Sequence, residues 1–110
     1  PLLKAFAHAY DQGKDHWVVR DPLLSPVFAS DEVLAQLPPT TILSGGLDPL
    51  LDDSVDFNTR IRRMGVAGEI RIYRSLPHTF VSFPHWHGLL PEVDEALRDS
   101  VRCIESFCGL

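Results

Sequence analysis

Long apolar runs are missing from this 110-residue chain. No stretch of about 18 or more consecutive apolar residues occurs, so no membrane-spanning helix is predicted. The first residues also lack the charged and apolar regions of a secretory signal peptide. The chain begins at Pro1 and not at Met, and we therefore expect a fragment of a longer protein.

Basic residues are scarce. The chain has 10 Lys and Arg residues against 15 Asp and Glu residues, which gives a net charge of −5. Phosphate binding needs clustered basic side chains, so no nucleic-acid partner is expected. The one cluster, Arg60, Arg62 and Arg63, is expected to lie on a solvated helix face.

Metal-binding side chains are few and badly spaced. Cys103 and Cys108 are the only cysteines, and at five positions apart on a predicted helix they point to different faces, so we expect free thiols. His85 and His87 lie near His78 without a close acidic or cysteine partner, which favours surface loop residues over a metal site. We therefore expect no metal site, and since no Gly-rich phosphate-binding loop is present either, no nucleotide cofactor is expected.

Apolar periodicity predicts alternating helices and strands. With 45% hydrophobic and 23% charged residues, the composition is that of a globular protein with a packed core. Two short β-branched or alternating runs bounded by turn residues predict strands, and amphipathic spacing predicts helices. The strands are expected at about 40–46 and 69–74, and the helices at about 1–10, 52–64 and 92–107, with a short helical turn at 31–36.

A helix between two strands predicts a parallel pair and an α/β fold. Parallel strands are usually buried on both faces and need neighbours, so the two strands are expected to belong to a larger sheet. Phe57, Ile61 and Met64 form the predicted apolar stripe of the middle helix, which Gly65 should end. The last helix has a predicted buried face that comprises Val93, Ala96, Leu97, Ser100, Val101, Ile104 and Phe107. Its charged residues are expected mostly outside: Glu92, Asp94, Glu95, Arg98, Asp99 and Glu105.

Two ionisable residues follow the carboxyl ends of the predicted strands. Asp48 lies just past the first strand and His78 just past the second. Ligands bind at this edge of open α/β sheets, and an Asp–His pair can hold the imidazole in the tautomer that acts as a base. We expect the two groups within about 2.6–3.2 Å of each other. The alternatives are that Asp48 is only a turn or N-cap residue and His78 only a loop residue.

The residues around this pair resemble a known family. The segments Leu47-Asp48-Pro49-Leu50-Leu51-Asp52-Asp53 and Leu76-Pro77-His78-Thr79-Phe80 are similar to the acid and histidine motifs of the hormone-sensitive lipase family, with animal members closest. Residues 21–27 and 37–40 also resemble that family, and the resemblance covers roughly residues 20–107.

The resemblance implies that residues 1–110 are the C-terminal part of one α/β-hydrolase catalytic domain. Such enzymes cleave carboxylic esters with a serine, a histidine and an acid, in the chain order nucleophile, acid, histidine. Asp48 would orient the imidazole and His78 would act as the base. The implied substrates are acylglycerols, cholesteryl esters or short-chain esters. The implied location is the cytoplasm or the lipid-droplet surface, and the implied partner is the N-terminal remainder of the domain.

The sequence also departs from the family. None of its eight serines lies in a G-x-S-x-G pattern; Ser44 comes nearest, and the oxyanion loop is also missing. We therefore expect this chain to be inactive alone. Thr79 replaces the usual glycine after the histidine, which favours the alternative of a non-catalytic binding module. Phe80 and Phe83 are candidates for an acyl pocket, with ordinary packing as the alternative.

Overall fold

The computed structural model describes residues 20–23, 25–82 and 88–109. The predicted strands and the last two predicted helices are confirmed, with ends that differ by one residue, while the helix predicted at 1–10 lies outside the described residues. The described elements are the 3-10 helix η1 (Pro26–Phe28), α2 (Asp31–Leu34), β1 (Thr40–Gly45), α3 (Leu51–Arg63), β2 (Gly68–Tyr73), the 3-10 helix η2 (Phe80–Ser82) and α4 (Pro91–Cys108).

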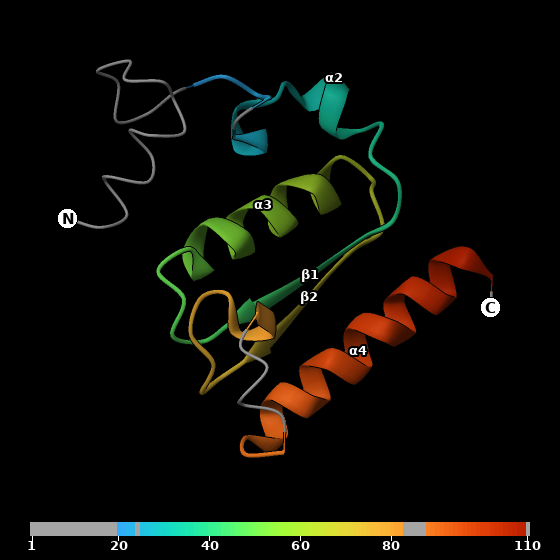
Figure 1. Cartoon of the computed structure of the whole chain (residues 1–110). Helices are drawn as coiled ribbons and strands as arrows, with labels where there is room; N and C mark the ends of the chain where they lie inside the picture. Colours follow the sequence, from blue (N-terminus) through green and yellow to red (C-terminus); the bar gives the residue numbers. More distant parts are fainter. Residues whose placement is uncertain (1–19, 24, 83–87, 110) are drawn as a thin grey trace.

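The two strands pair in parallel, as predicted. Thr40 lies opposite Gly68 at one end of the pair, and Gly45 lies opposite Tyr73 at the other. Helix α3 connects the strands and lies on one side of them, while α4 lies on the other (Figure 1). Because both strands run the same way, their carboxyl ends share one edge of the sheet.

Helix α3 follows the sequence signals closely. Asp52 and Asp53 occupy its first turn and three arginines its last, which complements the helix dipole. Gly65 follows with a φ of 88°, the left-handed conformation that ends helices and suits glycine. Ile61 is fully buried with Leu34 and Val66, and Phe57 and Met64 pack against this cluster.

The prediction that Arg60 is only a surface residue is wrong. Its guanidinium is paired with Asp31 at 2.6 Å and donates to the backbone carbonyls of Val27 and Ala29 at 2.6 and 2.7 Å. A fork of several donors suits such a cluster of acceptors. Arg60 thus holds the segment around η1 against α3.

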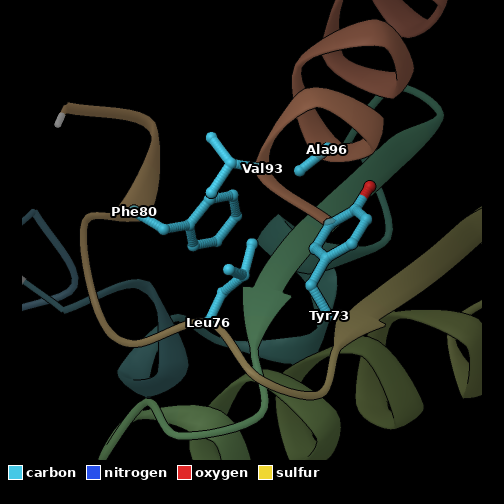
Figure 2. Packing of buried hydrophobic residues seen from close by; sticks show 5 residues of the cluster. All are labelled: Tyr73, Leu76, Phe80, Val93 and Ala96. Carbon is cyan, nitrogen blue, oxygen red and sulfur yellow. The ribbon is translucent and has the colours of Figure 1, made fainter. Parts of the chain in front are cut away.

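The buried face of α4 is shorter than the helical pattern predicts. Val93 and Ala96 are fully buried, but Val101, Ile104 and Phe107 are 53, 61 and 56% exposed. Beyond the apolar cluster of Figure 2, the contact that β2 makes with α4 is polar: Arg71 pairs with Asp99 at 3.0 Å. The prediction of a full-length apolar contact is therefore wrong for the described part of the chain.

The prediction that Asp99 lies outside is also wrong. Its side chain is 12% exposed and its Oδ2 accepts a hydrogen bond from the Tyr73 hydroxyl at 2.9 Å. Its Oδ1 lies 3.0 Å from Arg71 Nη1 and 3.5 Å from Arg102 Nη1. The hydrogen bond from Tyr73, together with Arg71, lowers the pKa of Asp99. Asp99 is thus a polar anchor between α4 and β2.

Asp99 should make the stability of the full-length protein sensitive to acid. A carboxyl with a lowered folded pKa stabilises the fold fully above its unfolded pKa of about 4, and this contribution is lost as the pH falls through the folded value. We expect the difference in unfolding free energy between wild type and D99N to shrink between pH 6 and pH 3 in urea titrations. E105Q, an exposed change on the same helix, should show no such trend, and a constant D99N difference would contradict the assignment.

The exposed half of α4 predicts poor folding in isolation. In the part of the chain that the structure describes, two strands that pair only with each other and an uncovered apolar stripe leave little core. We expect the purified 110-residue polypeptide to bind ANS and to melt without a cooperative transition in circular dichroism. A cooperative, reversible melt of a monomer would contradict this.

Candidate active site

The loops that follow β1 and β2 are joined through their backbones. Gly46 N donates to Tyr73 O at 2.7 Å, and Leu47 N donates to Leu76 O at 3.0 Å. At Gly46 an added Cβ would lie 2.5 Å from the carbonyl oxygen of Arg74, so the close approach uses the missing side chain of glycine. These contacts bring the segments of Asp48 and His78 together.

Asp48 and His78 form the predicted contact. Asp48 Oδ2 lies 2.9 Å from His78 Nδ1, within the expected range. The second oxygen, Oδ1, accepts a hydrogen bond from the backbone N–H of Leu50 at 2.8 Å, which is an Asx turn. The turn and pairing interpretations of Asp48 therefore both hold, one for each carboxylate oxygen, and the two bonds together orient the carboxylate.

The two members of the Asp48–His78 pair differ in solvent exposure. The Asp48 side chain is 12% exposed and that of His78 is 49% exposed. A carboxylate at Nδ1 favours the tautomer with the proton on that nitrogen, which leaves the Nε2 lone pair as a base. The imidazole can therefore take a proton from a group that approaches its open side.

The segment around His78 is held by residues on both sides of it. Leu76 is fully buried and Phe80 is 5% exposed, and both pack with Tyr73, Val93 and Ala96 (Figure 2). Phe80 thus occupies the core position that packing predicts, and its contact with a substrate stays a prediction. The other pocket candidate, Phe83, lies outside the described residues, as do His85 and His87.

Thr79 has an unusual backbone for its residue type. Its φ is 60°, in the left-handed region where a β-branched side chain is strained. Its hydroxyl donates to the carbonyl of His78 at 2.7 Å, and its own carbonyl accepts from Ser82 N at 2.8 Å. The Asp48–His78 contact forms with this strain in place, so Thr79 does not prevent the pairing.

Other sequence candidates do not join the pair. Asp52 and Asp53 are exposed in the first turn of α3. Ser44 is 3% exposed within β1. A nucleophilic serine in this type of fold lies on the turn between a strand and a helix, and Ser44 lies in the strand instead. Among residues 20–23, 25–82 and 88–109, no three His, Cys, Asp or Glu side chains are grouped to hold a metal ion.

Sequence reasoning missed one residue beside the histidine segment. Glu92, in the first turn of α4, accepts a hydrogen bond from Ser75 N at 3.0 Å. Acidic residues are common in the first turn of helices because they interact favourably with the helix dipole, so no sequence signal singled out Glu92.

In the described part of the chain, none of the helices is long and apolar enough to cross a bilayer.

Sequence comparison connects this geometry to known proteins. Residues 2–82 match the family model described as alpha/beta hydrolase fold. Hormone-sensitive lipase of Bos taurus is 45% identical over 65 residues, which are 59% of this chain and 9% of the lipase. The chain therefore spans only a small part of the length of this relative.

Solved structures agree over more of the chain. Brefeldin A esterase, a bacterial homologue of human hormone sensitive lipase, is 37% identical with a TM-score of 0.70, and the match covers 91% of this chain and 26% of that one. Esterase Est22 is 30% identical with a TM-score of 0.66, covering 94% of this chain and 26% of the esterase. The similarity thus extends over both strands and both long helices.

Replacing Thr79 by glycine should stabilise the full-length protein. Left-handed backbone costs a residue with a Cβ about 1–2 kcal/mol, and this exceeds the entropy that glycine adds to the unfolded chain. Because T79G also removes the hydroxyl bond to the His78 carbonyl, we expect it to raise the free energy of unfolding by about 0.5 kcal/mol in urea titrations. The matched change T59G, on the exposed side of α3, should lower it by about 0.3 kcal/mol, because glycine is a poorer helix former than threonine. Equal losses in both variants would contradict the strain at Thr79.

Proposed function

This chain belongs to the alpha/beta hydrolase fold family, and on that premise we propose that it supplies the acid and the histidine of a serine carboxylic ester hydrolase. The observation that supports the proposal is the 2.9 Å contact between Asp48 Oδ2 and His78 Nδ1. It lies at the carboxyl edge of two parallel strands, where ligands bind in open α/β sheets.

In the proposed reaction, Asp48 keeps the imidazole proton on Nδ1 and stabilises the imidazolium when it forms. His78 Nε2 takes the proton of a serine hydroxyl as the serine oxygen bonds to the ester carbonyl carbon. The same proton then passes to the leaving alcohol as the ester C–O bond breaks. In the second half of the reaction, His78 takes a proton from water as the water oxygen bonds to the acyl carbon. It then returns this proton to the serine oxygen as the bond between serine and the acyl group breaks, and the carboxylic acid leaves.

The serine is proposed to lie N-terminal to the residues of this chain. The printed sequence holds no G-x-S-x-G pattern and no glycine-rich oxyanion segment. In α/β-hydrolases both features precede the acid and the histidine. Two further observations support a missing part of the domain: the uncovered stripe of α4 and the partly exposed first four residues of β1.

The proposed substrates are carboxylic esters with an apolar acyl group, such as acylglycerols, cholesteryl esters or short-chain esters. The names of the relatives, lipase and esterase, support the ester class. The choice among these esters and a cytoplasmic or lipid-droplet location are the finer parts of the proposal. They rest on the resemblance to hormone-sensitive lipase.

The alternative function is a hydrolase-like binding module without catalysis, which the strained Thr79 favours. The two functions differ in the nucleophile. A fluorophosphonate probe labels an activated serine covalently, so labelling of the full-length protein supports the enzyme. A folded protein that is neither labelled nor active on esters supports the binding module.

Loss of either member of the pair should abolish most activity. We expect D48N and H78Q to lower kcat of the full-length protein on p-nitrophenyl butyrate on the order of 10³-fold or more, because the imidazole loses its orientation or the base is removed. D52N, an exposed change at the start of α3, should leave kcat within about twofold. Wild-type kcat in D48N would rule out the proposed role of the acid.

A further inference from the structure

We propose that Asp99 is a positioning residue for His78: through Tyr73 it sets the place of α4, and α4 holds the segment that carries the histidine. This inference rests on the proposed function, in which Asp48 and His78 act on the substrate and Asp99 touches none of the reacting atoms. Asp99 has no part in the proton transfers described above, although its carboxylate is as well covered as that of Asp48, with both side chains 12% exposed.

The contacts of Asp99 are directional. Two partners on β2 reach its carboxylate, the Tyr73 hydroxyl at 2.9 Å and the Arg71 guanidinium at 3.0 Å, while Arg102 of α4 itself lies 3.5 Å away. A covered charge is costly unless such partners satisfy it. Apolar contacts between helix and sheet tolerate sliding, whereas hydrogen bonds and ion pairs select one alignment. Asp99 therefore selects the register of α4 along β2.

Tyr73 connects this anchor to both loops of the candidate site. It is the last residue of β2, and its carbonyl accepts hydrogen bonds from Gly46 N at 2.7 Å and Leu76 N at 3.2 Å. Its ring meets the ring of Phe80 edge to face, with centroids 5.6 Å apart. In Figure 2 its hydroxyl points toward α4 while Phe80 lies on the other side of the cluster. One side chain thus contacts the anchor and the residue two positions after His78.

Helix α4 contacts the segment that carries His78 on both sides of this histidine. Before the histidine, Glu92 accepts the N–H of Ser75 at 3.0 Å. After it, Phe80 packs in the cluster that contains Val93 and Ala96 of α4. A shift of α4 would therefore move both ends of this short segment, and a misplacement of about 1 Å in a catalytic group can cost on the order of 100-fold in rate.

The first test measures kcat and KM of the full-length protein with p-nitrophenyl butyrate. We expect D99N and Y73F each to lower kcat about 10-fold or more with KM within about twofold. The double variant should be no slower than D99N, because both changes break one link. E105Q, the same chemical change at an exposed position of α4, should keep wild-type kcat. Effects of D99N and Y73F that multiply would overturn the link through Tyr73.

The second test does not require activity. In ¹⁵N-histidine-labelled full-length protein, the Nδ1–H proton of His78, assigned by its loss in D48N, reports the bond to Asp48. We expect D99N and Y73F to weaken this signal through faster exchange with water, and E105Q to preserve it. If D99N does not fold, Y73F carries the test, since it removes only a hydroxyl. A signal and kcat that stay at wild-type values while the melting temperature falls would show that Asp99 is only structural.

The two tests separate the proposals. Full-length protein that hydrolyses no ester, or that is unaffected by D48N, would refute the proposed function. The Nδ1–H signal would still decide whether Asp99 positions His78.

Discussion

Parallel pairing of β1 with β2 is the constraint on which the candidate site depends. Because the strands run in one direction, residues 30 positions apart arrive at the same edge of the sheet. The backbone hydrogen bonds from Gly46 to Tyr73 and from Leu47 to Leu76 then hold the two loops together. The side chains of Asp48 and His78 on these loops can therefore form a hydrogen bond. An antiparallel pair would place Asp48 and His78 at opposite ends of the strands.

The pair shows how one carboxylate can serve structure and chemistry together. One oxygen of Asp48 completes a turn with Leu50 and the other meets His78. The turn bond limits rotation of the carboxylate, so its second oxygen keeps a fixed direction toward the imidazole. The open side of His78 remains for a reacting group, and the left-handed backbone of Thr79 lies next to it.

Polar residues decide how α4 lies on the sheet. The apolar cluster reaches only the first turns of α4, and beyond it Arg71 of β2 needs a polar partner on the helix. Asp99 meets that requirement, and Val101, Ile104 and Phe107 are left uncovered. The same arrangement anchors the helix and leaves an apolar stripe that the rest of the proposed domain would cover.

Local patterns predicted the two strands, the two long helices and the parallel order, because periodicity and turn residues depend on neighbours along the chain. Strand-end positions and the motif residues together predicted the Asp48–His78 contact. The burial of Asp99, the contacts of Arg60, the uncovered end of α4 and the left-handed backbone of Thr79 came only from the tertiary structure. Helical spacing shows which residues share a face, but the partner of that face comes from distant segments. In this protein β2 presents Tyr73 and Arg71 to α4, so that Asp99 is buried as their partner, while Val101, Ile104 and Phe107 stay exposed.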